Sequence, residues 1–113
     1  MKKNKALAEM AELLKLLGDT SRLAILALLQ VRELCVGEMV QMLEISPSNA
    51  SQHLRKLRTA GLVREDKRGQ WVYYSLNLDE FPDLKVFLSQ LPGRQEIEEA
   101  MTLSLTEGGG IPL

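Results

Sequence analysis

The chain has 113 residues, of which 45% are hydrophobic and 26% are charged, and its formal net charge is -1 at pH 7. This length predicts one domain without a second independent core, and the composition excludes collagen-like and intrinsically disordered classes. The longest apolar run, residues 23–29, is too short for a transmembrane helix, which needs about 20 residues.

The N-terminal segment and the cysteine content favour a cytoplasmic protein without membrane contacts. The first residues are rich in lysine, but Glu9 and Glu12 interrupt the stretch that follows, so it lacks the apolar run of a signal peptide. The single cysteine, Cys35, excludes an intramolecular disulfide framework.

Charge is unevenly distributed along this near-neutral chain. Residues 47–76 carry six Lys and Arg residues against two acids, a balance of +4, whereas residues 77–113 carry seven acids against two cations, a balance of -5. A basic segment within a neutral protein is compatible with nucleic-acid binding through that segment.

Hydrophobic periodicity predicts two helices near the N-terminus. The first runs from about residue 5 to 17 and ends at Gly18. Asp19 is expected to cap the second, residues 20 to about 29, because its carboxylate accepts backbone N–H bonds that the first turn leaves unpaired. The second helix is apolar on most sides and is expected at the centre of the core. The apolar stripe of the first helix consists of Leu7, Met10, Leu14 and Leu17.

Two further helices follow, joined by a tight link. A short third helix is predicted over residues 36–43. Ser46 and Pro47 suit the N-cap and first position of a fourth helix, which Gly61 ends with a left-handed C-cap. A short helix, a tight link and a second helix are the pattern of a helix-turn-helix.

After the fourth helix the sequence period changes from helical to alternating. Residues 62–66 and 70–76 flank Lys67-Arg68-Gly69, a pattern typical of a β-hairpin with glycine in the turn. The aromatic residues of the second strand are able to stack on bases, but in a hairpin they more often pack against the domain. They are Trp71, Tyr73 and Tyr74.

The last predicted helix spans about residues 80–91, and Pro92-Gly93 ends it. It has an apolar stripe of its own, so the first and last helices together carry more apolar surface than one small domain easily covers, which fits dimerisation. This second stripe consists of Phe81, Leu84, Leu88 and Leu91.

Residues 47–60 have two distinct faces on a helical wheel. Ala50, Leu54 and Leu57 form a narrow apolar stripe, opposite small polar residues in the first two turns and cations in the last two. Such a helix suits a DNA major groove, with its cations against backbone phosphates. A solvated surface helix would also be polar outside, but the preceding short helix and the following basic hairpin favour a helix-turn-helix with a wing. The outer face carries Ser48, Asn49, Ser51, Gln52, Arg55, Lys56 and Thr59.

Together the elements predict a mostly α-helical fold with a small β-hairpin, a homodimeric winged helix-turn-helix of order α-α-α-α-β-β-α. Residues 1–92 are assigned to this DNA-binding domain, with dimerising first and last helices. Residues 93–113 are assigned to an acidic C-terminal extension, with a weak helix over 94–106 and a flexible tail from Gly108.

Four stretches resemble the ArsR/SmtB family of bacterial winged-helix repressors, in the family's order within about residues 5–91. They are LGDTSRL (17–23), ELCVGE (33–38), SPSNASQHLRKL (46–57) and QWVYY (70–74). The resemblance implies a homodimer joined through its first and last helices, a recognition helix followed by a wing, and release from double-stranded operator DNA when an inducer binds. The inducer is unknown.

The resemblance also implies, by position, which residues face DNA. In the recognition helix these are Ser48, Asn49, Ser51, Gln52 and Arg55, and in the wing Arg68. Charge and position add Lys56 in the helix and Lys67 at the hairpin tip as residues that meet phosphates.

The family's usual metal chemistry is missing from this sequence. Many metal-sensing members carry a Cys-Val-Cys triplet where this chain has Cys35-Val36-Gly37, and glycine offers no donor. The other common family site uses Asp and His ligands on the last helix, whereas the only histidine here is His53 in the recognition helix. We therefore expect no metal site and no cofactor. Arsenite or another thiophilic ion would bind only if Cys35 found further donors.

Two residues have alternative interpretations that the sequence leaves open. Cys35 is either a small residue packing the start of the third helix, the more common case, or a sensing thiol whose pKa the helix N-terminus lowers. His53 lies at the edge of the apolar stripe and is expected to be packed or hydrogen-bonded rather than a ligand.

Other functions fit the sequence less well. Cys35 and His53 lack the third, orienting residue of a nucleophilic enzyme, and acids interrupt the basic face that a membrane-surface helix needs. A winged-helix module for protein contacts, the main alternative, would not need a face of small polar residues beside Arg55. The sequence therefore predicts a sequence-specific DNA-binding transcriptional regulator, a repressor released by an inducer, and not an enzyme.

Overall fold

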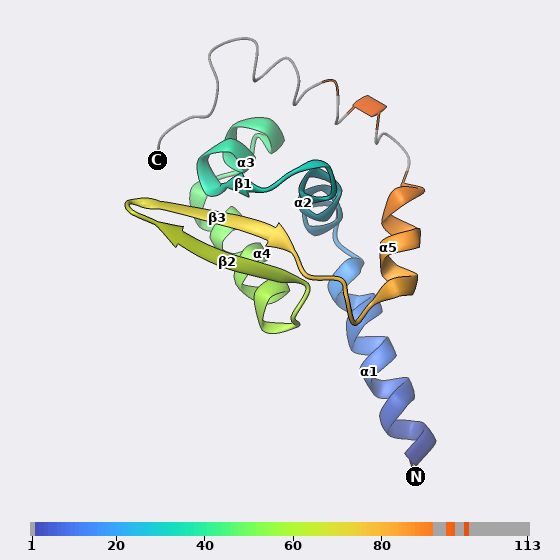
Figure 1. The fold of residues 1–113 in the computed structure, drawn as a ribbon. Helices are drawn as coiled ribbons and strands as arrows, with labels where there is room; N and C mark the ends of the chain where they lie inside the picture. The colour runs from blue at the N-terminus through green and yellow to red at the C-terminus, as the bar shows by residue number, and fades with distance from the viewer. Residues whose placement is uncertain (1, 92–94, 97–98, 100–113) are drawn as a thin grey trace.

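A computed structural model of the chain describes residues 2–91, 95–96 and 99 (Figure 1). The predicted mostly helical fold with a hairpin before the last helix is confirmed. Of the predicted acidic extension, all but residues 95–96 and 99 lie outside the described residues. The elements are α1 (Lys2–Leu17), α2 (Thr20–Val31), β1 (Leu34–Cys35), α3 (Val36–Leu43), α4 (Pro47–Thr59), β2 (Val63–Arg68), β3 (Trp71–Leu76) and α5 (Pro82–Ser89).

Side-chain caps fix the starts of α2 and α4. The Asp19 carboxylate accepts a hydrogen bond of 2.9 Å from the Arg22 backbone N–H, and this bond lowers the pKa of Asp19. The Ser46 hydroxyl accepts from the Asn49 backbone N–H at 3.1 Å, and Pro47 opens the first turn of α4. Both caps are those predicted, because a cap depends on residues only three positions apart.

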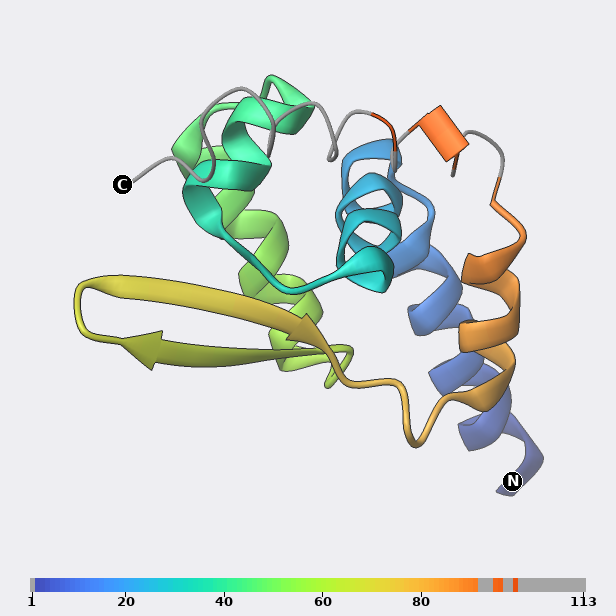
Figure 2. The same ribbon diagram turned by 45° about the horizontal axis from the view of Figure 1, so that its top comes forward.

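The three strands form one antiparallel sheet in the order β1-β3-β2. The sequence did not predict β1, which pairs Leu34 with Tyr74 and Cys35 with Tyr73. Two residues are too few to show an alternating pattern, so only the pairing with β3 identifies this strand. Figure 2 shows the β2–β3 hairpin extending away from the helices as a wing.

The hairpin turn lies further along the chain than predicted. β2 continues through Lys67 and Arg68, which pair with Val72 and Trp71, so the turn consists of Gly69 and Gln70. Gly69 has a φ of 64°, a left-handed value of the kind that two-residue hairpin turns require. Glycine lies in the turn as predicted, but the first strand continues beyond residue 66, where it was expected to end, because strand pairing extends right up to this turn.

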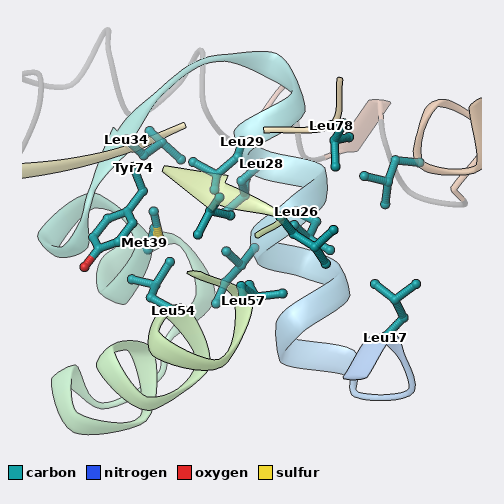
Figure 3. Close-up of a cluster of buried hydrophobic side chains, with 14 of the residues drawn as sticks. Leu17, Leu26, Leu28, Leu29, Leu34, Met39, Leu54, Leu57, Tyr74 and Leu78 are labelled. Atoms are coloured by element: carbon teal, nitrogen blue, oxygen red, sulfur yellow. The ribbon is translucent and has the colours of Figure 1, made fainter. Parts of the chain in front are cut away.

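The hydrophobic core lies between α2, the wing sheet and the inner faces of the other helices. α2 is at its centre, as predicted, with Ile25 and Leu26 fully buried. Figure 3 shows residues of α3, α4 and β3 converging on the same cluster. From α4, Leu54 and Leu57 have no exposed surface, and burial of each contributes about 1.5–3 kcal/mol. This burial fixes which face of α4 points outward.

The outer face of α1 is apolar and exposed. Leu7, Met10 and Leu14 are 67%, 55% and 61% exposed, whereas Leu17 at the end of the same stripe is buried. In both views α1 extends past the body of the domain with α5 beside it (Figures 1 and 2). Among the described residues, none of the helices combines the length and the apolar character that crossing a membrane requires.

α5 is shorter than predicted, and its apolar stripe faces inward. Leu84 and Leu88 are buried in the core of the same chain, and Phe81 and Leu91 pack against it. The expectation of surplus apolar surface on the first and last helices is therefore wrong for the α5 stripe, whereas Leu7, Met10 and Leu14 of the α1 stripe are exposed as expected. Periodicity identifies a buried face without telling which partner buries it. The exposed apolar residues of α5 are Val86 and Phe87.

Candidate nucleic-acid interface

α3 and α4 form the predicted helix-turn-helix. α3 ends at Leu43, and the left-handed backbone of its C-cap residue Glu44 (φ 54°, ψ 43°) turns the chain sharply before Ser46 caps α4. Met39 of α3 and Leu54 of α4 belong to the same buried cluster, which locks the two helices together. The tight link and the shared core give α4 a fixed orientation.

The outer face of α4 carries the residues predicted to contact bases. Within the described part of the chain, the side chains of Ser51 and Gln52 make no hydrogen bond or ion pair, so their polar groups are available to a ligand. The Ser48 hydroxyl lies 3.3 Å from the hydroxyl of the cap residue Ser46. The exposed predicted residues are Ser48, Asn49, Ser51, Gln52, Arg55 and Lys56.

His53 links α4 to α2. Its Nδ1 lies 3.2 Å from Nη1 of Arg22, while Nε of Arg22 donates to the Leu16 carbonyl at the end of α1. The half-buried imidazole therefore takes part in a hydrogen-bonded contact between helices. This confirms the expectation that His53 is a packed, hydrogen-bonded residue.

The wing holds the other two predicted residues, Lys67 and Arg68, at the end of β2. Lys67 is exposed, whereas Arg68 is bound within the chain. Nη1 and Nη2 of Arg68 donate to the two carboxylate oxygens of Glu33 at 2.7 and 2.9 Å, and Nε donates to Asp66 at 2.8 Å. The hydrogen bond from Arg68 lowers the pKa of Glu33, and the two carboxylates together raise the pKa of Arg68.

A second polar network joins the base of the wing to α4. Arg58 of α4 forms an ion pair of 2.9 Å with Glu65 of β2, and the Tyr74 hydroxyl donates to the same carboxylate oxygen at 2.7 Å. Burial and the Glu65 carboxylate raise the pKa of Tyr74 to about 12. Tyr74 is buried, as expected for a packing aromatic residue. Trp71 and Tyr73 are half-buried, and the Tyr73 ring lies 4.7 Å from the Arg68 guanidinium.

Cys35 lies at the junction of β1 and α3, with 5% of its surface exposed. Of the two interpretations of Cys35, its burial supports the packing residue. Burial raises the pKa of the thiol, against the alternative in which the start of α3 lowers it, because desolvation outweighs the backbone hydrogen bonds there. Cys35 forms a capping box with Glu38, whose Oε1 accepts from the Cys35 backbone N–H at 3.1 Å. Arg32 completes the junction with an ion pair of 2.7 Å to Glu38.

Three carboxylates that hold arginines in this region were not predicted from the sequence. Each of them forms an ion pair with an arginine: Glu33, Glu38 and Glu65. None of the three lies at a periodic sequence position that would have indicated its arginine partner. The spacing of Arg32 and Glu38 is a local signal, but Glu33 and Arg68 are 35 residues apart. Among the described residues, no group of three or more His, Cys, Asp or Glu side chains is placed to hold a metal ion.

Comparisons with known proteins agree with this geometry. Residues 19–65 match the model of a family described as bacterial regulatory protein, arsR family. The chain is 43% identical over 91 residues to the transcriptional activator HlyU of Vibrio cholerae, covering 80% of this chain and 82% of that protein. It is 42% identical over 67 residues to the arsenical resistance operon repressor of Escherichia coli K12, covering 58% of this chain and 57% of the repressor.

Solved structures share the arrangement of elements. Reduced HlyU from Vibrio cholerae superposes with a TM-score of 0.70 at 39% identity, over 83% of this chain and 95% of that one. The homodimeric winged helix-turn-helix DNA-binding domain of Mb0332 from Mycobacterium bovis superposes with a TM-score of 0.67 at 28% identity, over 77% and 81% of the two chains. These relatives are named as regulators or DNA-binding domains, and none of them as an enzyme.

Proposed function

Because the chain belongs to the ArsR family of bacterial regulatory proteins and is a DNA-binding transcriptional regulator, we propose that α4 reads operator bases while the wing holds the backbone. One observation carries this proposal: polar side chains are exposed along α4, whose opposite face is buried in the core. A helix so anchored presents its donors and acceptors in a fixed register to a major groove.

The proposed roles follow from side-chain chemistry. Gln52 is our choice for a base contact, because a glutamine amide pairs with adenine through two hydrogen bonds. Ser48, Asn49 and Ser51 surround it in the first turns of α4 and reach base edges or nearby phosphates. The cations, placed further along α4 and at the wing tip, neutralise phosphates: Arg55, Lys56, Lys67 and Arg68.

The functional unit we propose is a homodimer formed through α1 and α5. A groove of about 510 Å³ lies between these helices, lined by residues such as Met10, Leu14 and Phe87. These three side chains are 55%, 61% and 48% exposed, and a second copy would cover them. Two recognition helices related by a two-fold axis predict an inverted repeat with half-sites about 10 bp apart.

We further propose that the protein represses transcription until an inducer releases it, as its likeness to an operon repressor supports. A soft metal ion is a poor candidate inducer. Arsenite needs two or three thiolates, whereas Cys35 is the only cysteine of the chain and its thiol is buried and protonated at neutral pH. A small organic inducer fits this arrangement better, because a buried, protonated thiol is also a poor target for an oxidant.

The test begins with selection of duplexes from a random-sequence library by the purified protein. Fluorescence anisotropy then compares the selected duplex with a scrambled one, and sedimentation gives the stoichiometry of the complex. We expect a dimer that prefers the selected duplex by at least about a thousandfold. Equal affinity for both duplexes would refute base reading, and a monomer under binding conditions would refute the dimer. Arsenite, zinc, a persulfide and organic ligands are then tested for release.

A further inference from the structure

Arg68 of the wing is held by carboxylates of its own chain. The Glu33 carboxylate accepts hydrogen bonds from both terminal nitrogens of the guanidinium at 2.7 and 2.9 Å, and the Asp66 carboxylate accepts one from Nε at 2.8 Å. The Tyr73 ring lies against the same group, 4.7 Å from its centre. We call Glu33 and Asp66 the carboxylate clamp.

The clamp uses the N–H groups that a DNA phosphate would use. Arginine binds carboxylate and phosphate in the same way, through two parallel N–H···O bonds from its planar fork. A phosphate therefore gains this geometry on Arg68 only after it displaces Glu33. It also approaches a surface on which two negative charges remain.

From this geometry we infer that Glu33 is an intramolecular competitor of the DNA phosphate for Arg68. The inference rests on the proposed function of the wing, and it adds a positioning residue outside the helix-turn-helix and the wing. Glu33 lowers the affinity of the wing for every duplex alike, because phosphates carry no sequence information.

The two carboxylates of the clamp differ in how they move with Arg68. Asp66 lies two residues away on the same strand, so it accompanies Arg68 wherever the hairpin goes. Glu33 lies directly before β1, and its bonds to Arg68 join the end of α2 to the wing. Only the Glu33 contact has to break when the wing tip shifts towards DNA, so Glu33 is the residue to test.

Lys67 provides the matched cation. It neighbours Arg68 on β2 and is exposed, and within the described residues it forms no ion pair. Successive residues of a strand point to opposite faces, so Lys67 and Arg68 do not share the clamp. Loss of Glu33 should therefore act through Arg68 and leave any contribution of Lys67 unchanged.

The test measures anisotropy of a duplex selected by the wild-type protein and of a scrambled duplex. Glu33→Gln should tighten binding to both by about two- to fivefold, the range of an exposed ion pair. The gain should shrink as salt rises, because screening weakens the clamp. In an Arg68→Ala background the gain should vanish, and in a Lys67→Ala background it should persist.

Two results would overturn the inference. Weaker binding by Glu33→Gln would mean that Glu33 presents Arg68 to DNA rather than competing for it. Asp79→Asn is the charge control, because it also removes one negative charge from an ion pair, that of Asp79 with Arg64 at 3.7 Å. An equal gain in DNA affinity by Asp79→Asn would mean that net charge explains the effect of Glu33→Gln. If the wild-type protein bound no duplex at all, the proposed function would fail instead, so the two failures are distinguishable.

Discussion

The outer face of α4 and the tip of the wing are both polar and exposed, but different forces hold them. Ala50, Leu54 and Leu57 anchor α4 from behind, while Gln52 on its outer face makes no hydrogen bond or ion pair to any other described residue. At the wing tip, Arg68 is engaged by carboxylates at every nitrogen of its guanidinium.

In α4, the groups that hold the element in place differ from those proposed to bind DNA, whereas at the wing tip Arg68 does both. In α4, apolar burial fixes the helix and leaves its polar groups to the ligand. At the wing tip, Arg68, which is proposed to bind DNA, already binds two carboxylates of its own chain, so DNA binding by Arg68 is an exchange of partners. Substitutions should therefore change stability and affinity independently in α4, and together at the wing tip.

Leu54→Ala should have the largest effect on stability. The side chain is fully buried, and its truncation should lower the free energy of unfolding by about 2–5 kcal/mol, measured by urea denaturation. The adjacent exposed residue supplies the control, since Arg55→Ala should change stability by no more than about 0.5 kcal/mol. Comparable losses in the two variants would show that core burial does not anchor α4.

Gln52→Ala should weaken binding to the selected duplex by about 1–3 kcal/mol and leave binding to a scrambled duplex nearly unchanged. The reason is that only a base-reading contact distinguishes the two duplexes. Gln90→Ala, an exposed amide at the end of α5, should alter neither affinity. An equal loss of affinity for both duplexes would assign Gln52 to the phosphates instead.

Glu38→Gln should destabilise the junction of β1 and α3, which connects the wing sheet to the first helix of the helix-turn-helix. Burial alone would raise the pKa of Glu38, but hydrogen bonds from Arg32 and the Cys35 amide outweigh it and lower the pKa. The carboxylate therefore stabilises the fold fully above its unfolded pKa of about 4.5, and this contribution disappears as the pH falls through the lower, folded pKa.

At pH 7 we expect Glu38→Gln to cost about 1–2 kcal/mol of the free energy of unfolding, because Arg32 keeps some contact with water. Denaturation between pH 7 and 3 should show the difference between wild type and variant narrowing below pH 4.5. A difference independent of pH would mean that the charge of Glu38 is irrelevant. The exposed Glu80→Gln serves as the matched substitution.

Tyr74→Phe should have the smallest effect of these substitutions. It removes the hydrogen bond to Glu65 but keeps the buried ring, so the free energy of unfolding should fall by about 0.5–1.5 kcal/mol. Tyr73→Phe is the control, because the contact of Tyr73 with Arg68 is through its ring and survives in phenylalanine. Identical stability of both variants would mean that the hydrogen bond between Tyr74 and Glu65 does not stabilise the fold.

Local signals explain what the sequence predicted well. The caps of α2 and α4 depend on neighbouring residues, and the apolar stripe of α4 is a short-range period. The outer face of α4 was predictable for this reason, because its orientation follows from Ala50, Leu54 and Leu57.

Features that depend on distant partners were not predictable in this way. β1 is a strand only because Leu34 and Cys35 pair with β3, and the period of α5 does not tell which surface buries Leu84 and Leu88. The bond between Glu33 and Arg68 joins residues that no periodic pattern relates. The sequence therefore indicated which cations lie at the wing tip but not that one of them is already bound.

The burial of Cys35 has a kinetic consequence. An alkylating reagent reaches this thiol only when β1 separates from β3 or the start of α3 frays, so the labelling rate reports how often this region opens. Because β1 pairs with a strand of the wing, the alkylation rate of Cys35 reports the opening of the sheet to which the wing belongs. A duplex that restrains the wing should lower the alkylation rate of Cys35. This rate therefore reports DNA binding without a label on the surface that faces DNA.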